Sequence, residues 1–444
     1  MMSTLSSPPT DRSIRNASAL TAVRGTLSRA LLPVASLFAL CALAVPQQAA
    51  AYWVDFCADY RVAYADGDSG VGDDYFTNNN NKPARGARIR VTENSSGTDV
   101  FNDYTPYEDP GTGCTGDLWL VGSESYTVKI LADASVRNNT IEVRGPGGGY
   151  WASTWASSFT PTATETIDIT TGLHDAWNIA AAAGWAMKRR TGGVSGETFT
   201  FFNQACPGGT GNCNSGGDIY VITTDSKYVI VHEMGHRLAR FANNDNADTF
   251  SYLASPDACH TNNPGGTGHE INSKEYQSAA AMEGIASYYA AVAFNKTNEF
   301  DCNYASHRWI DWDLDGVQDE PTVDWDSDGN VDYWPFNCEG AAIAGQDAKD
   351  YLGDYCLGSG VIWNRGTQYD WIRFFWDLDT EHSLGASDIF NLWDDANPHN
   401  WSTSSDLVWV PITNETPWFR LYLAADAAGF GPAFIDEAGN GVWR

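Results

Sequence analysis

The sequence has few positively charged residues. Lysine and arginine together number 26 against 56 aspartates and glutamates, which gives a formal net charge of −30. Phosphate backbones and anionic membrane surfaces repel a chain of this charge, so neither nucleic acid nor such a membrane is expected as a partner. The acidic excess fits an extracellular protein or one that holds divalent cations.

The sequence also lacks the uninterrupted apolar run of about 20 residues that a transmembrane helix needs. The run at 30–45 is shorter and contains Pro33. It follows four arginines, the last of them Arg29, and precedes the small residues Ala49-Ala50-Ala51. Residues 1–51 are therefore predicted to be a signal peptide of a secreted protein, and no membrane anchor is expected.

Cysteine is uncommon, with nine residues, and Cys41 lies in the predicted signal peptide. An even number remains, which in an exported protein predicts disulfides. Short spacing along the chain favours the pairs Cys206–Cys213 and Cys338–Cys356. The remaining four cysteines are then expected to pair as Cys57–Cys114 and Cys259–Cys302.

Local patterns divide the remaining chain into a strand-rich and a helix-rich part. Alternating residues separated by Asn- and Gly-rich turns predict strands at 87–91, 126–131 and 140–143, and further strands are expected at 198–203 and 218–223. Helix formers and apolar spacing predict helices at 175–190, 278–294, 369–376, 386–393 and 418–428.

Only eight histidines occur, and two of them fall in His232-Glu233-Met234-Gly235-His236. Residues four apart share one face of a helix, so these imidazoles can hold one metal ion. Imidazole suits zinc, and a glutamate beside the first histidine can act as general base on a zinc-bound water. Thr224 or Asp225 can cap this helix, expected at 228–241. We interpret the motif as a zinc site; the alternative is a surface helix with two chance histidines.

A catalytic zinc usually has three protein ligands, so one more is expected downstream. Glu283 is the single charged residue between Glu275 and Lys296 in a helical run. A lone buried carboxylate costs several kcal/mol unless it is paired or binds metal, which makes Glu283 the predicted ligand. The alternative is a core glutamate bonded to tyrosine or arginine. The other candidates were Asp257, His260, His269, Glu270 and Glu275.

Small residues near Glu283 bear on how its helix packs. Ala279, Ala280 and Gly284 are expected to let this helix approach the histidine helix closely.

The histidine motif and the later Glu283-Gly284-Ile285-Ala286 together resemble the gluzincins, zincin-type peptidases that include thermolysin-like, aminopeptidase and lethal factor-like enzymes. The resemblance implies zinc held by His232, His236 and Glu283, with Glu233 as the base. Metzincins are excluded because Ala242 stands where their third histidine belongs. The Asn-Glu-x-x-Ser-Asp form of the thermolysin group is absent, which argues against close kinship with that group. The aminopeptidase Gly-x-Met-Glu-Asn motif is also absent, which favours an endopeptidase over an aminopeptidase.

The predicted fold class is therefore α+β. An N-terminal antiparallel β-sandwich module is expected at 52–165 and the N-terminal half of a zincin catalytic domain at 166–300. A mainly helical C-terminal region with calcium-binding loops is expected at 301–444.

A repeated acidic pattern predicts the calcium sites. Aspartates at alternate positions before a glycine place oxygen ligands around Ca²⁺. The twelfth positions are Thr322 and Pro335 rather than glutamate, so the loops are closer to thrombospondin type 3 or dockerin-like loops than to EF-hands. The alternative is a solvated acidic loop. The predicted ligands are Asp311, Asp313, Asp315, Asp319, Asp324, Asp326, Asp328 and Asp332.

Tyr276 is predicted to stabilise the oxyanion formed during hydrolysis. It lies two turns before Glu283, on the same face if the helix extends that far back. The lethal factor-like gluzincins, in which a tyrosine at similar spacing has this role, support the assignment. The competing donors were His260, His269, Tyr288 and Tyr289.

The predicted function is a secreted, calcium-stabilised zinc metallopeptidase that acts on peptide or protein substrates. Two other functions stay open from the residues alone. One is a zinc hydrolase of a non-peptide substrate, and the other is a non-catalytic binding or surface protein with structural metals. Glu233 argues against the second, since a structural site needs no base.

Overall fold

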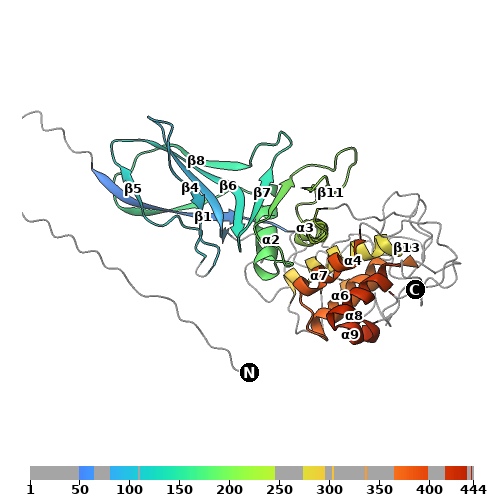
Figure 1. The fold of residues 1–444 in the computed structure, drawn as a ribbon. Coiled ribbons are helices and arrows are strands. Elements are labelled where there is room, and N and C mark those ends of the chain that lie inside the picture. The colour runs from blue at the N-terminus through green and yellow to red at the C-terminus, as the bar shows by residue number, and fades with distance from the viewer. Residues whose placement is uncertain are drawn as a thin grey trace, which may run out of the picture. The chain divides into compact units, whose positions relative to one another are not determined.

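The computed structural model describes residues 50–64, 81–108, 111–245, 274–295, 303–304, 336–337, 365–398, 416–437 and 442. Ala49–Arg444 form one unit, drawn in Figure 1. The predicted signal peptide lies outside the described residues except for its last two, of which Ala51 begins the first strand.

Strand β1 (Ala51–Arg61) organises the first sheet. Its even-numbered side chains Val54, Phe56, Ala58 and Tyr60 are buried, as expected for a strand with one face in the core. β1 pairs antiparallel with β2 (Asn81–Pro83) and β5 (Leu118–Val121), and in parallel with β9 (Glu165–Thr170).

The second sheet has eight strands, seven of them in the order β11-β12-β10-β7-β6-β3-β4, with β8 paired to β6. The predicted strands at 87–91, 126–131 and 140–143 are confirmed as parts of β3, β6 and β7. The bounds are β3 (Ala87–Glu93), β4 (Asp99–Tyr104), β6 (Tyr126–Val136), β7 (Asn139–Arg144), β8 (Ala152–Phe159), β10 (Thr198–Phe202), β11 (Cys213–Ser215) and β12 (Asp218–Tyr220).

The two sheets meet through aromatic side chains. Phe56 of β1 lies 5.6 Å from Phe159 and 6.1 Å from Trp155 of β8, measured between ring centroids. Pairing within the second sheet also continues past residue 165, because β7 pairs in parallel with β10 and β10 with β12. Strands from the first two predicted domains therefore share one sheet.

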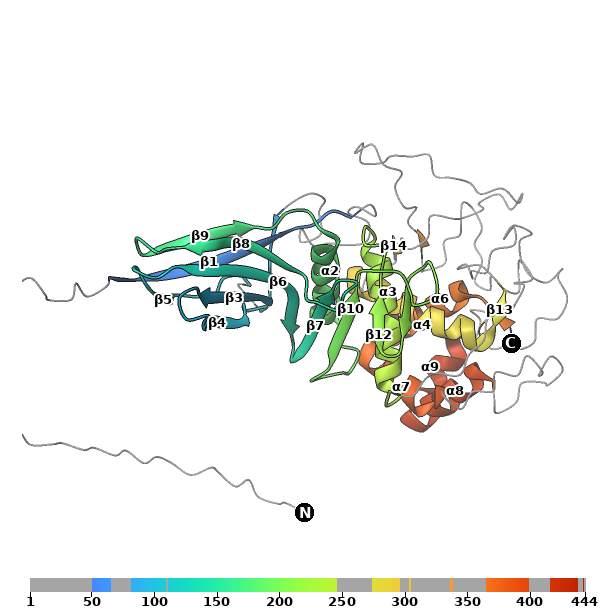
Figure 2. The same ribbon diagram turned by 90° about the horizontal axis from the view of Figure 1, so that it is seen from above.

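Four helices follow one another away from the second sheet. α2 (Asp175–Arg189) packs on β6 and β7, α3 (Lys227–Ala242) on α2, α4 (Gln277–Phe294) on α3, and α6 (Gln368–Thr380) on α4 (Figure 2). The later helices are α7 (Ala386–Asp395), α8 (Pro417–Ala428) and α9 (Gly431–Asp436). All of the predicted helices are confirmed.

The described short strands form two further pairs. β13 (Glu275–Tyr276) pairs with β16 (Arg365–Gly366), and β14 (Asn303–Tyr304) pairs with β15 (Phe336–Asn337).

Two predicted disulfides are confirmed, Cys57–Cys114 and Cys206–Cys213. The other two predicted pairs lie outside the described residues. The two bonds are compatible with an extracellular protein. Over the described ranges, no helix is both long and apolar enough to cross a membrane.

Candidate metal centre

Helix α3 presents the two histidines of the motif on one face. The helix begins after Ser226, whose side chain accepts a hydrogen bond from the Val229 amide. The prediction of Thr224 or Asp225 as the cap was wrong. Threonine, aspartate and serine can all cap a helix, and the residue directly before the first helical residue, Lys227, is Ser226. His232 and His236 are half-buried, and their Nε2 atoms lie 3.1 Å apart.

Helix α4 brings Glu283 to the same point. All 18 residues of α4 are buried, and Glu283 itself is 3% exposed. Its Oε2 lies 3.1 Å from His232 Nε2 and 3.4 Å from His236 Nε2. The structure thus brings Glu283, the third residue predicted from the sequence, next to the two imidazoles.

The separations of these three atoms fit a tetrahedral zinc ion. A zinc–ligand length of about 2.05 Å at a tetrahedral angle puts neighbouring ligand atoms about 3.3 Å apart. The three observed separations are 3.1, 3.1 and 3.4 Å. His232, His236 and Glu283 can therefore hold one metal ion, and a three-ligand set leaves a fourth position open.

Ser287 and Gln368 orient His232, and sequence reasoning missed both. Ser287 Oγ lies 2.9 Å from His232 Nδ1, and Gln368 Nε2 donates to Ser287 Oγ at 2.6 Å. A proton on Nδ1 directed at Ser287 leaves Nε2 free to bind metal. Ser287 had a usable signal, since it lies one turn after Glu283 on the same face. Gln368 comes from a distant helix and had none.

Two glycines beside the ligands allow close helix packing. A Cβ on Gly235 would lie 2.7 Å from Ala286 Cα, so α3 and α4 touch through backbone at this point. A Cβ on Gly284 would collide with Trp371 of α6. The prediction that Gly284 admits the histidine helix was wrong, because a residue one step from Glu283 is turned about 100° around the helix, here towards α6.

The two predicted catalytic side chains lie on the same two segments. Glu233 follows His232 on α3 and is 7% exposed. Tyr276 is the residue before α4, with extended backbone, and the Arg365 guanidinium lies 4.4 Å above its ring. Because α4 begins at Gln277, the condition that the helix extend back to Tyr276 is not met, and its role stays a prediction.

The competing tyrosines point their hydroxyls elsewhere. Tyr288 donates to Asp379 Oδ2 at 2.8 Å, and Tyr289 donates to the Arg190 carbonyl at 2.8 Å. Burial, followed by the nearby Asp379 carboxylate, raises the pKa of Tyr288 well above its usual value. Neither hydroxyl is available as an oxyanion donor.

The remaining predicted site residues, the eight calcium-binding aspartates from Asp311 to Asp332, lie outside the described residues, as do His260 and His269.

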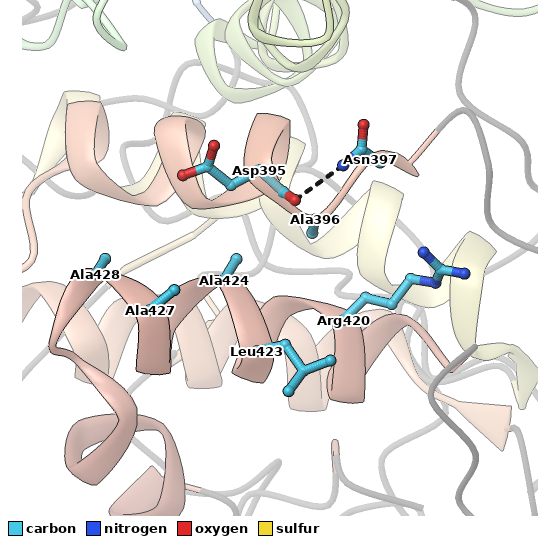
Figure 3. A pocket seen from close by; sticks show the side chains of 8 residues that line it. All are labelled: Asp395, Ala396, Asn397, Arg420, Leu423, Ala424, Ala427 and Ala428. Atoms are coloured by element: carbon cyan, nitrogen blue, oxygen red, sulfur yellow. Dashed lines mark hydrogen bonds between the residues drawn. The ribbon is translucent and has the colours of Figure 1, made fainter.

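A separate pocket lies between the end of α7 and helix α8 (Figure 3). Its lining includes four alanines, Leu423 and Arg420, and the Asn397 side chain donates to the Asp395 carbonyl at 3.0 Å. None of the histidines or glutamates of the metal cluster lines it. The pocket therefore offers no catalytic group to the metal centre.

Comparison of the chain with protein-family models and with curated proteins finds no match.

Proposed function

We propose that this chain is a secreted zinc metallopeptidase of gluzincin type, most simply an endopeptidase. The observation that carries the proposal is the approach of His232 Nε2, His236 Nε2 and Glu283 Oε2 to within 3.1–3.4 Å of one another. Two imidazoles and one carboxylate form a known catalytic zinc set. The sequence supplies a glutamate beside the first histidine, which a purely structural site does not need.

When bound, zinc supplies Lewis acidity, which polarises a carbonyl and lowers the pKa of a water molecule to about 7. The chain's own residues do the rest. His232, His236 and Glu283 hold the ion, and the Ser287 contact fixes the ring of His232. Glu233 takes a proton from the attacking water and gives it to the leaving amine. Tyr276 is proposed to donate a hydrogen bond to the developing oxyanion.

An edge strand favours a peptide substrate over other hydrolysable molecules. Among the strands that the structure describes, β11 is the last of its sheet and pairs with β12, and it contacts α3. An extended peptide can add to such an edge through its main-chain hydrogen bonds. A peptide bound in this way would lie beside the helix that carries Glu233.

Cleavage of a peptide library by the purified protein tests the proposal. Activity should disappear with a chelator that binds transition metals but spares calcium, and should return on addition of zinc. Glu233→Gln should lower kcat by about 10²- to 10⁴-fold while zinc content stays unchanged. Glu165→Gln, at an exposed position on β9, is the matched control and should keep full activity.

Each contrary outcome identifies a different alternative. Hydrolysis of ester or amide reporters without cleavage of any peptide would indicate a non-peptide hydrolase. Zinc binding without any hydrolysis would indicate a non-catalytic metalloprotein.

A further inference from the structure

A second group of imidazole and carboxylate side chains lies where α6 and α9 end. Glu381 is the C-terminal cap of α6 and His382 follows it, while Glu437 is the cap of α9 and Asp436 its last residue. The helices are joined by Phe374 of α6 and Phe434 of α9, whose rings pack edge to face at 5.0 Å. Figure 1 shows α6, α8 and α9 together in this region.

One imidazole–carboxylate pair in this group is as close as the pairs of the candidate metal centre. His382 Nε2 lies 2.9 Å from Glu437 Oε1, compared with 3.1 Å between His232 Nε2 and Glu283 Oε2. Asp436 Oδ2 is 3.7 Å from His382 Nε2. Glu381, His382 and Glu437 each offer one ligand atom, and these atoms lie within 4.8 Å of one another.

The local charge favours a cation. Three carboxylates lie near one imidazole, with Glu381 exposed and the Asp436 side chain 75% exposed, and the C-terminal ends of two helices add partial negative charge. The pair at the centre is sheltered, since the side chains of Glu437 and His382 are 11% and 22% exposed. A divalent ion bound here neutralises more of this charge than a proton on His382 does.

We infer that Glu381, His382 and Glu437, with Asp436 beside them, form a second divalent-metal site that takes a transition-metal ion such as zinc. A nitrogen ligand with carboxylates suits such ions, whereas calcium prefers oxygen ligands alone. The site ties the short helix α9 to the end of α6. Along α6 it lies roughly 20 Å from Gln368 at the other end, at 1.5 Å per residue, so its role is structural rather than catalytic.

Metal counting on the full chain separates this site from the first. His232→Ala/His236→Ala protein, stripped and reloaded with zinc in millimolar calcium, should keep one zinc per chain. Adding His382→Ala should remove that zinc. Glu437→Gln on the same background keeps an acceptor for the His382 ring and should still weaken zinc binding, which separates metal loss from misfolding. His382→Ala alone should leave peptide cleavage unchanged.

Two results would overturn the inference. The first is that the His232→Ala/His236→Ala protein binds no zinc. The second is that this protein binds zinc and that neither His382→Ala nor Glu437→Gln reduces the amount bound. Failure of the proposed function looks different. If the first site binds no metal, the wild type and the His232→Ala/His236→Ala protein would hold the same amount of zinc, while His382→Ala would still remove one ion. If the first site binds zinc without catalysis, the wild type would hold both ions and cleave no peptide.

Discussion

The two helices that supply the candidate metal ligands differ in burial. α3 is amphipathic, and the face with His232 and His236 stays partly open. α4 is buried along its whole length, and Glu283 is its one charged residue. The site therefore has a partly exposed side on α3, where the His232 and His236 side chains are 13% and 14% exposed, and a buried side on α4 that holds the carboxylate.

This difference decides what each ligand contributes. A neutral imidazole costs less to bury than a charged carboxylate does. A carboxylate at 3% exposure costs several kcal/mol unless a cation or hydrogen-bond donors lie beside it. Glu283 thus links metal binding to the stability of the helical layer more strongly than either histidine.

The largest effect is expected at Tyr276, the residue immediately before the buried helix α4. Tyr276→Phe should lower kcat roughly a hundredfold or more and leave KM and zinc content little changed, as expected for a contact made only in the transition state. Tyr289→Phe is the control: it loses a bond to the Arg190 carbonyl and should cost about 1 kcal/mol of stability without changing kcat. Wild-type kcat in Tyr276→Phe would remove this residue from the mechanism.

The backbone contact between the two helices is the next test. Gly235→Ala places a methyl group 2.7 Å from Ala286 Cα, so α3 and α4 must move apart. We expect a loss of about 1–3 kcal/mol in unfolding free energy together with weaker zinc binding. Gly172→Ala, with no neighbouring atom within 4 Å, should stay within about 0.5 kcal/mol of wild type. Equal stability of the two variants in denaturant melts would show that the helices do not touch at Gly235.

Ser287 connects the two helices of the site, since it lies on α4 and contacts His232 of α3. Ser287→Ala should lower zinc affinity about 10- to 100-fold, because the ring of His232 loses its orienting partner. Ser278→Ala, also buried on α4, should leave affinity unchanged. Competition titrations with a zinc indicator measure both, and equal affinities would mean that Ser287 only fills space.

A separate, pH-dependent effect is expected far from the site, at the buried carboxylate of Asp133. Asp133 is fully buried, with Arg88 Nη1 at 3.8 Å. Burial, followed by the nearby Glu142, raises the pKa of Asp133 from 3.8 to about 7. The folded state therefore holds this proton more tightly than the unfolded chain does.

The sign of the pH dependence follows from that shift. The stability contributed by the proton is present below pH 3.8 and is lost as pH rises to about 7. Asp133→Asn should remove this pH-dependent loss of stability. The free energy of unfolding of the variant relative to wild type should therefore increase as the pH rises from 3.8 to about 7. Asp117→Asn, at an exposed position, should follow wild type. Parallel pH profiles for wild type and Asp133→Asn would contradict the assignment.

Local pattern predicted the ligand helices well. The histidine spacing and the lone charge in an alanine-rich run identified three residues that the structure brings together. Both signals are local, and each fixes one face of one helix. The mixed helix and strand content followed from the same kind of pattern.

What sequence did not predict depends on contacts between distant segments. Gln368 reaches Ser287 across 81 positions, and no local feature marks it. Gly284 was assigned to the wrong neighbour because its direction depends on where α6 packs. The pairing of β7 with β10 joins strands across the predicted domain boundary, which turn residues alone cannot reveal.

The most direct test of the metal centre compares its two glutamates. Zinc per chain is measured for Glu233→Gln and Glu283→Ala, each with His382→Ala to empty the second site and with calcium present. We predict one zinc in the Glu233→Gln protein and a large loss in the Glu283→Ala protein, because Glu283 Oε2 lies within 3.4 Å of the Nε2 atoms of both imidazoles. Equal zinc in the two proteins would contradict the assignment of Glu283 and place the third ligand elsewhere.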